Sequence, residues 1–368
     1  MRVRYRSVPD PLTQMAHQLL SIEEKRSYNG PWTQLWADLP AMILITGGSG
    51  FIGSNLLGAL SETGERVSIC DTLGTGNKWL NVAKHEVDEI VAPESLSEIL
   101  TRRRDEISFV YHMGAVTATT ETDVDLILDS NLRLSQKIWH WCSQYQVPLV
   151  YASSAATYGD GRQGFSDIED RGYLETLRPT NPYGWSKHVF DRWVVREVDE
   201  GRSHPPFWAG LKFFNVYGPN EYHKEDMRSA VTKAYGDAAA NQPVTLFRSH
   251  HPEYKDGEQK RDFIYVKDCV DVILWLSEQT PASGIYNVGT GRAQTWLELM
   301  SALYASVDRT PNIQWVDTPP AIRDGYQYFT QADMTKLRRA GYTNPFASVD
   351  EGVSDYVQHF LSKKDPHR

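Results

Sequence analysis

The sequence is poor in cysteine, and this excludes two kinds of architecture. Its three cysteines, Cys70, Cys142 and Cys269, lie in apolar surroundings without C-x-x-C spacing. A disulfide framework needs paired cysteines, and a structural zinc site needs closely spaced thiolates. We therefore expect buried thiols in a reducing compartment, and a cytoplasmic protein.

The sequence also lacks an excess of positive charge and any long apolar run. Its 368 residues carry 38 Lys and Arg against 47 Asp and Glu, a formal net charge of −9. This balance disfavours general nucleic-acid binding, and no apolar stretch is long enough to span a bilayer. Neither nucleic acid nor membrane is expected as a partner. A local basic pocket can still hold an anionic ligand.

The first 41 residues lack regular periodicity. "MRVRYRSVPDPLTQMAHQLL" has early arginines but no continuous apolar core, which disfavours a secretory signal, and acidic residues disfavour a transit peptide. We expect residues 1–41 to be an N-terminal extension that is poorly ordered or docked at the periphery. A start misassigned upstream of Met42 would give the same pattern.

From Met42 onward, short apolar runs alternate with helical patterns. "MILIT", "RVSICD", "FVYHMGA" and "PLVYASS" are typical of strands, and residues 54–63 and 126–145 are typical of helices. This alternation predicts an α/β fold with a doubly wound parallel sheet, the Rossmann architecture. Beyond Asn215 the pattern loosens, but it still indicates a strand in "GIYNVGTGR", a helix over 295–307, and a closing amphipathic helix capped by Ser348.

Two domains are expected after the extension. The dinucleotide-binding domain is predicted to comprise residues 42–213, 264–291 and 340–362. A smaller, mostly C-terminal α/β substrate domain is predicted to comprise residues 214–263 and 292–339.

A glycine-rich loop lies between the first strand and the first helix. Gly47, Gly50 and Gly53 have the spacing G-x-x-G-x-x-G, and Asp71 ends the next strand about twenty residues on. Glycines let backbone N–H groups approach a pyrophosphate, and a helix N-terminus favours negative charge. A structural turn could use the same glycines, but the strand, helix and Asp71 favour a dinucleotide site. Asp71 should accept a hydrogen bond from the adenosine ribose, which favours NAD. Lys78 could compensate the negative charge of Asp71 beside a 2′-phosphate, so NAD and NADP both remain possible cofactors.

Tyr183 and Lys187 lie four residues apart at the start of a predicted helix, in "YGWSK". Such residues share a helix face, so the ammonium could lower the phenol pKa from about 10 toward neutrality. Alone, this spacing is more often an incidental surface pair. Beside a dinucleotide, Tyr183 could act as base on a carbinol while the nicotinamide takes the hydride, with Lys187 also binding the nicotinamide ribose. Ser153 and Ser154, just past a strand in "YASSAATYG", offer a hydroxyl for the substrate oxygen.

These motifs are shared with a known group of enzymes. "TGGSGFIG", "YASSAATYG" and "YGWSK" resemble the extended short-chain dehydrogenase/reductase superfamily of nucleotide-sugar epimerases and dehydratases. "KFFNVYGPNEYHKEDM", "KRDFIYVKDC", "GIYNVGTGRAQTW" and "GYQYFTQADMTKLRRAGY" resemble one family within it, the ADP-L-glycero-D-manno-heptose 6-epimerases. The similarity runs from Met42 to about Leu361.

The resemblance implies an activity, a cofactor and an assembly. The activity is inversion of C6 of the heptose in ADP-D-glycero-D-manno-heptose, through a transient ketone that is re-reduced by bound NADP, with NAD as the alternative. The family is cytoplasmic, supplies heptose for the lipopolysaccharide core, and is homo-oligomeric, with pentamers among known members.

The resemblance also assigns roles to individual residues. Tyr183 matches the acid/base, Lys187 its partner, and Ser154 the serine near the substrate hydroxyl. Lys224 in "EYHKEDM" matches a second acid/base, which is needed because the ketone must turn its other face to the hydride and its oxygen then points elsewhere. The expected cofactor contacts are Gly47, Gly50, Phe51, Ile52, Gly53, Asp71, Thr72, Lys78, Met113, Gly114, Ala115, Val116, Thr117, Lys187 and Val216. The expected substrate contacts are Asn215, Asp226, Lys233, Phe247, Arg261 and Tyr326, with Arg261 as the pyrophosphate clamp.

The chain departs from the family pattern in four places. Family members have serine where Asp226 stands and histidine where Lys233 stands. The segment from Phe247 to Arg261 is longer than in the shorter members and carries His250 and His251, which could reshape the nucleotide pocket. Adjacent histidines without a spaced third ligand do not indicate a metal, and none is predicted. The N-terminal extension has no counterpart.

Two alternatives stay open. Another nucleotide-sugar epimerase or a 4,6-dehydratase would share the motifs, but a dehydratase should carry acidic residues beside the strand-end serine, and "SSAATYG" has none. A non-enzymatic, cofactor-sensing protein on the same fold would often have lost the tyrosine or the lysine, and both are present.

Overall fold

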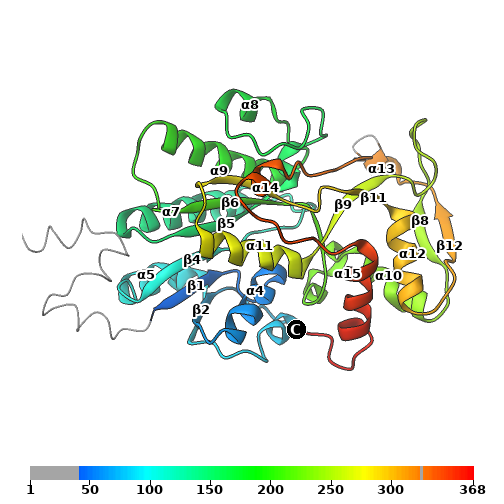
Figure 1. Ribbon diagram of the computed structural model, residues 1–368, viewed down its shortest axis with the longest axis horizontal. Helices are drawn as coiled ribbons and strands as arrows, with labels where there is room; N and C mark the ends of the chain where they lie inside the picture. Colours follow the sequence, from blue (N-terminus) through cyan, green and yellow to red (C-terminus); the bar gives the residue numbers. More distant parts are fainter. Residues whose placement is uncertain (1–40, 324–325) are drawn as a thin grey trace, which may run out of the picture. The chain divides into compact units, whose positions relative to one another are not determined.

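A seven-stranded sheet is the main element of the chain (Figure 1). The computed structural model describes residues 41–323 and 326–368. The strands are β1 (Met42–Thr46), β2 (Arg66–Cys70), β3 (Glu89–Val91), β4 (Ile107–His112), β5 (Leu149–Ser154), β6 (Trp208–Phe213) and β10 (Gly284–Val288). Their order is β10-β6-β5-β4-β1-β2-β3, and all pairings are parallel. The predicted doubly wound parallel sheet is confirmed.

The strands are apolar because helices cover both faces of the sheet. Every residue of β1, β6 and β10 is buried, as expected for parallel strands without a solvent face. Figure 1 shows α7 (Leu134–Tyr145) and α9 (Pro182–Asp199) on one face, and α4 (Phe51–Glu62) and α11 (Val266–Gln279) on the other. The strand order reverses between β1 and β4, which is the switch point where such sheets bind ligands.

A second group of elements follows β6 in the chain. Its strands form two small sheets: β7 (Asn215–Tyr217), β9 (Lys260–Tyr265) and β11 (Ala293–Thr295) in one, and β8 (Val244–Phe247) and β12 (Ile313–Val316) in the other. Its main helices are α10 (Ala230–Ala239), α12 (Trp296–Ser306) and α15 (Val349–Tyr356). Val231, Leu299, Tyr304 and Val353 belong to its separate apolar cluster.

The predicted helix starts at Thr295 and Ser348 are confirmed. Each side chain accepts a hydrogen bond from the N–H three residues on, and a glutamate at that position bonds back, which makes both capping boxes. The predicted helix 126–145 comprises α6 (Val124–Leu128), a π-helical turn and α7. The remaining helices and turns are α5 (Leu96–Arg102), α8 (Arg171–Thr176), α13 (Pro320–Arg323), α14 (Thr335–Arg339), η1 (Asn77–Asn81), η2 (Pro93–Ser95), η3 (Asp129–Arg133), η4 (Ala155–Tyr158), η5 (Tyr222–Met227) and η6 (Val357–Leu361).

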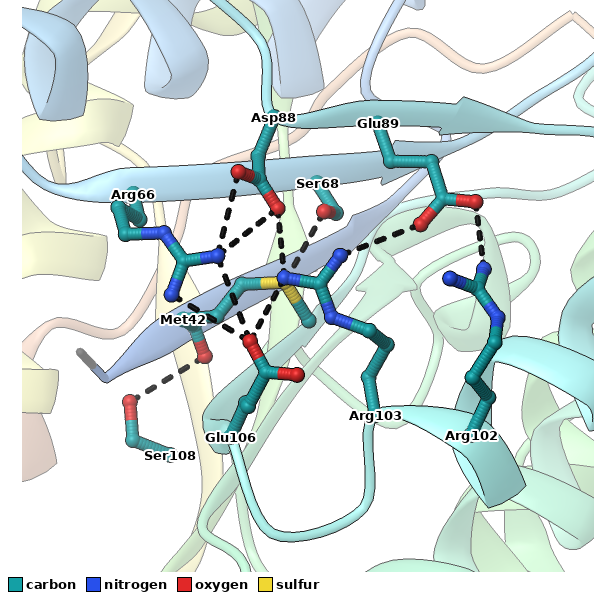
Figure 2. A network of polar contacts seen from close by, with 9 residues as sticks. All are labelled: Met42, Arg66, Ser68, Asp88, Glu89, Arg102, Arg103, Glu106 and Ser108. Atoms are coloured by element: carbon teal, nitrogen blue, oxygen red, sulfur yellow. Dashed lines mark hydrogen bonds and ion pairs between the residues drawn. The ribbon is translucent and has the colours of Figure 1, made fainter. Parts of the chain in front are cut away.

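An ion-pair network lies at the amino ends of the strands (Figure 2). Arg103 contacts Asp88 at 2.7 Å, Glu106 at 2.7 Å and Glu89 at 3.4 Å. Arg66, the first residue of β2, reaches Asp88 and Glu106 as well. The network therefore ties together the starts of β2, β3 and β4, at the end of the sheet opposite the ligand-binding edge.

The three cysteines are buried and unpaired, as predicted. Burial raises the pKa of the Cys70 thiol to about 12. Met42–Arg368 forms one compact unit, and its division into a cofactor and a substrate domain stays a prediction. The expectation for residues 1–41 falls on residues outside the described ranges, apart from Ala41. Within those ranges, no helix is both long and apolar enough to cross a membrane.

Candidate active site

The glycine loop is packed too tightly for any larger side chain. Gly47 has φ +70°, and a Cβ on it would lie 2.5 Å from the backbone of Gly114, in the loop just after β4. A Cβ on Gly53 would lie 2.2 Å from the Gly47 carbonyl oxygen. Helix α4 begins just after Gly50 with no side-chain cap and no acidic residue in its first turn. This cradle fits a dinucleotide pyrophosphate, because the helix N-terminus presents N–H groups and partial positive charge to an anion.

Asp71, at the end of β2, is paired rather than free. Its Oδ1 accepts from Lys78 Nζ at 2.7 Å and from the N–H of Thr72 at 2.7 Å. Its Oδ2 accepts from the N–H and hydroxyl of Ser49, at 2.9 and 2.5 Å. Lys78 thus neutralises the carboxylate at the point where the adenosine ribose of a dinucleotide would lie.

One cavity of about 1390 Å³ runs from this loop to the second group of elements. It brings together most of the predicted site residues. Those that line it are Gly47, Gly50, Phe51, Ile52, Gly53, Asp71, Lys78, Met113, Gly114, Ala115, Val116, Thr117, Ser154, Tyr183, Lys187, Asn215, Val216, Lys224 and Tyr326.

Five predicted residues do not line the cavity. They are Thr72, Asp226, Lys233, Phe247 and Arg261. Arg261 is only 7% exposed; its guanidinium donates to the carbonyl oxygens of Lys260 and Gln327 and lies 5.5 Å from the Tyr326 ring. To clamp a pyrophosphate it would have to leave these partners, so its role stays a prediction, as do those of exposed Asp226 and Lys233.

Helix α9 starts where the sequence predicted. Asn181 caps it by accepting from the N–H of Gly184 at 2.8 Å, and Pro182 occupies the first turn, where no N–H is needed. This start places Tyr183 and Lys187 in the first two turns, facing the end of β5. Lys187 Nζ donates to the Ala152 carbonyl oxygen at 2.8 Å.

Ser154 ends β5 beside this pair. Its Oγ accepts from the N–H of Ala156 at 3.1 Å, and it also hydrogen-bonds with Tyr183. A hydroxyl fixed in this way can hold the oxygen of a carbinol or ketone next to the Tyr183 phenol.

The sequence predicted a depressed pKa for Tyr183, and this prediction is wrong for the structure. Burial raises the Tyr183 pKa above 10, Asp191 raises it further, and only the hydrogen bond with Ser154 lowers it. Lys187 is itself buried, which lowers its pKa to about 8, and it donates to a backbone carbonyl. The i, i+4 spacing correctly predicted that Tyr183 and Lys187 lie close together, but it could not show their burial. Burial has a larger effect on the Tyr183 pKa than the neighbouring amine.

Lys224 lies across the cavity on η5. Its Nζ is 5.2 Å from the centre of the Phe51 ring, at the start of α4. Burial lowers the Lys224 pKa, and nearby Glu221 opposes this. The neighbouring Glu225 has φ +47°, a left-handed conformation that is rare for a residue with a side chain. Tyr183 and Lys224 therefore have pKa values moved in opposite directions in one cavity.

Sequence reasoning missed Asn131, which lies on the π-helical turn η3. Its Oδ1 accepts from the N–H of Val116 at 2.8 Å, and its Nδ2 donates to the Val116 carbonyl at 2.9 Å and to Ser186 at 3.0 Å. Ser186 in turn donates to the Tyr183 carbonyl. Asn131 thus fixes the loop after β4 against α9. The available signal was an asparagine inside the predicted helix 126–145, where this residue type is disfavoured unless its side chain has a role.

The long segment between Phe247 and Arg261 brings two aromatic side chains to the cavity, of which sequence reasoning named His251 and missed Tyr254. Both line the cavity and pack against Tyr328, with ring centres 5.1 and 5.3 Å away. The expectation that this segment reaches the pocket agrees with their position.

A parallel sheet with a phosphate loop at its switch point, and Tyr183, Lys187 and Ser154 in the same cavity, define a dinucleotide-dependent enzyme of the short-chain dehydrogenase/reductase type. The model of the NAD dependent epimerase/dehydratase family matches residues 43–289, and the chain belongs to this family.

Individual relatives and solved structures show which members of this family the chain is similar to. The ADP-L-glycero-D-manno-heptose-6-epimerase of Nitratidesulfovibrio vulgaris is 45% identical over 329 residues, which cover 89% of this chain and all of that protein. The crystal structure of the Helicobacter pylori ADP-L-glycero-D-manno-heptose-6-epimerase is similar with a TM-score of 0.72 and 26% identity, covering 87% of this chain and 96% of that one. UDP-glucose 4-epimerase of Thermus thermophilus, in complex with NAD, has a TM-score of 0.66 and 29% identity, covering 86% and 98%.

Proposed function

We propose that this chain interconverts ADP-D-glycero-D-manno-heptose and ADP-L-glycero-D-manno-heptose by inverting C6. The observation that carries the proposal is the single cavity that contains the glycine loop, Tyr183 with Ser154, and Lys224 on the far side. The epimerase relatives support the same substrate, since they match 89% of the chain at 45% identity.

The reaction needs a hydride acceptor and two proton-transfer groups. A nicotinamide bound at the glycine loop would supply the hydride acceptor for C6 and the hydride donor for the return step. In the first half, the C6 hydroxyl loses its proton to one side chain as the ketone forms. The ketone then turns about the C5–C6 bond, and a second side chain donates a proton to its oxygen as the hydride returns to the opposite face.

Tyr183 and Lys224 are suited to these two tasks. Burial holds the Tyr183 phenol protonated, so it is ready to donate, while burial favours the neutral amine of Lys224, which can accept. In the reverse reaction Tyr183 accepts the proton and Lys224 donates it. After each turnover, proton exchange with solvent restores both side chains to their starting states. Ser154 orients the oxygen next to Tyr183, and Lys187 supports the nicotinamide ribose.

An assay of epimer composition tests this function. Pure protein incubated with ADP-D-glycero-D-manno-heptose should give a mixture of both C6 epimers without added oxidant or reductant, seen by NMR of the sugar. No epimer formation, together with turnover of a UDP-hexose, would reject the heptose substrate and favour another nucleotide-sugar epimerase.

We propose NADP rather than NAD as the resident cofactor. Because Lys78 pairs with Asp71, a 2′-phosphate would meet an ion pair instead of a lone carboxylate, and the Lys78 ammonium could contact the phosphate as well. Lys78→Met should lower NADP affinity by about tenfold or more and shift preference toward NAD. Lys84→Met is the control, because Lys84 pairs with Asp365 and lies outside the cavity lining. Equal loss of both cofactors in the Lys78 variant would contradict the proposal.

The family resemblance also predicts a cytoplasmic homo-oligomer, with a pentamer as the expected size, that supplies heptose for the lipopolysaccharide core. Light scattering of the purified holoenzyme measures the size directly. A monomer that turns over at full rate would reject the oligomer.

A further inference from the structure

A buried ion pair lies directly behind the proposed site. Asp191 on α9 and Lys212 on β6 are 0% and 1% exposed, and Lys212 Nζ is 2.8 Å from Asp191 Oδ2. Removing two charges from water is costly, and apolar residues of similar volume often serve stability equally well. A pair of this kind therefore suggests a task other than stability.

The ion pair contacts the chain on both sides of Ser154. Asp191 Oδ2 accepts from Ser153 Oγ at 2.7 Å, on the residue just before Ser154. Lys212 Nζ donates to Thr157 Oγ1 at 2.6 Å, and Thr157 Oγ1 donates to the Ser154 carbonyl at 2.8 Å. The pair thus holds the strand end that presents Ser154.

The same pair acts on α9, which presents the other two groups. Asp191 follows Lys187 by four residues and Tyr183 by eight, so all three lie toward one face of the helix. Tyr151 on β5 donates to Asp191 Oδ1 at 3.2 Å, which ties the helix to the strand next to Lys212. Strand and helix are therefore joined through one carboxylate.

We propose that Asp191 and Lys212 are positioning residues for the epimerisation: together they fix Ser154 against Tyr183 and Lys187, and the Lys212 charge offsets the field of Asp191 at the phenol. The inference rests on the proposed roles of Tyr183 and Ser154. The negative charge of Asp191 raises the pKa of both Tyr183 and Lys187. For Tyr183 this adds to the larger effect of burial, and for Lys187 it opposes burial, which lowers the pKa.

Few other buried groups near Tyr183 and Lys187 carry charge at neutral pH. Burial lowers the pKa of His112 on β4 to about 3 and of His188 on α9 to about 4, and it raises the pKa values of Tyr151 and Tyr158. The charged groups on α6, η3, α8 and the outer face of α9 are exposed: Asp125, Asp129, Arg133, Arg171, Glu175 and Arg192. The charged groups that line the cavity include Asp71, Lys78, Asp160, Arg162, Lys224, Glu225, Arg228 and Glu253, and burial lowers the pKa of His223 there to about 4.

The test compares Lys212→Met, Asp191→Asn and the double variant as holoenzymes. Two readouts are taken across pH: kcat/KM for the heptose substrate, and the Tyr183 pKa from the 13Cζ resonance of tyrosine-labelled protein, assigned by its absence in Tyr183→Phe. Asp191 follows Tyr183 by eight residues, which corresponds to about 12 Å along the helix. At that distance and an effective dielectric of about 20, an unpaired charge should shift the Tyr183 pKa by about one unit.

The expected shifts have opposite signs. Lys212→Met leaves Asp191 unbalanced, so the Tyr183 pKa and the alkaline limb of kcat/KM, where the phenol loses its proton, should move up by about one pH unit. Asp191→Asn leaves Lys212 unbalanced, so both should move down. The double variant should return close to the wild-type position because no unpaired charge remains, and Lys212→Arg should do so as well.

Arg103→Met is the control for stability. Arg103 lies in the comparable network at the opposite end of the sheet (Figure 2), so its loss should lower the melting temperature without moving either readout. Shifts of the same sign in both single variants, or a Tyr183 pKa that stays in place in all of them, would overturn the inference. Absence of turnover in the wild type would instead reject the proposed function, and the resonance would still decide the role of the pair.

Discussion

At the scale of single residues, the proposed chemistry depends on two groups with opposed pKa shifts. Tyr183 is held protonated by burial, and Lys224 has its ammonium form disfavoured by burial. An enzyme that inverts one carbon reversibly needs a donor and an acceptor on different sides of the substrate, and opposed environments provide both at one pH.

Tyr183→Phe should lower kcat by about 10²–10⁴-fold, the usual contribution of a positioned acid or base. The bound nicotinamide should remain, because the phenol oxygen is not part of the phosphate cradle. Epimer formation by NMR and the absorbance of released cofactor measure the two effects.

Tyr304→Phe is the matched control. Its buried hydroxyl shares one proton between two carbonyl oxygens, at 2.9 and 2.7 Å, outside the cavity lining. This variant should lose stability and keep its turnover. An active Tyr183→Phe enzyme would contradict the acid/base role.

At the scale of elements, the phosphate loop is a steric device. Gly53→Ala would place a methyl group 2.2 Å from the Gly47 carbonyl, so the loop must open. We expect cofactor retention to fall and kcat/KM to drop at least about tenfold.

Gly236→Ala gives the comparison on another helix. Gly236 lies inside α10 without a positive φ, and a Cβ added to it would meet no atom of the described residues within 4 Å outside its own stretch of helix. The substitution should stabilise the protein by about 0.5–1 kcal/mol and leave turnover unchanged. Equal effects of the two substitutions would show that the loop tolerates a side chain. Thermal unfolding and cofactor content distinguish them.

Helix α11 carries a pH-dependent penalty in its first turn. Burial raises the Asp268 pKa to about 6, although its carboxylate accepts from the N–H of Ala347 at 2.9 Å. The folded state therefore binds more protons than the unfolded state between pH 3.8 and about 6, and wild-type stability falls as pH rises through that window.

Asp268→Asn should therefore stabilise the protein at pH 7 by about 1–2 kcal/mol, less than the full shift because part of the carboxyl faces solvent. The amide oxygen can keep the bond to Ala347. The advantage should shrink as the pH falls through this window and should approach zero only below pH 3.8, where both states of the wild type are protonated. A difference in melting temperature that does not change between pH 4 and 7 would refute this explanation.

Much of this element-scale organisation could be predicted from the sequence, because its signals are local. The apolar runs gave the parallel strands, and Ser348 gave the start of α15. Helix α4 begins at Phe51, earlier than the helical pattern suggested, because glycine weakens that pattern while backbone bonds still form the first turn. Helix α10 and the β8–β12 pair were missed, because packing on the second apolar cluster stabilises them.

The candidate site was predictable only in part, for the same reason. Spacing showed that Tyr183 and Lys187 share a helix face, but the sign of the Tyr183 pKa shift depends on burial and on Asp191, which the fold brings close. The partners of Asn131 and Lys212 lie on other elements and have no local signature.

At the scale of the whole molecule, Met42–Arg368 contains both apolar clusters and the cavity. Relatives match 89% of this chain along their full length. We therefore expect a protein that starts at Met42 to fold and to keep its turnover within about twofold. Activity and thermal unfolding of both forms check this. A loss of folding after removal of residues 1–41 would show that they stabilise the rest.

The most direct measurement of the central claim follows the hydrogen on C6. Substrate carrying deuterium at C6 is incubated with the holoenzyme in ordinary water, and the epimeric product is examined by NMR and mass spectrometry. Transient oxidation with a tightly held nicotinamide predicts that the product keeps its deuterium at C6. Loss of the label to solvent during inversion would show proton abstraction from carbon, and would contradict the hydride mechanism.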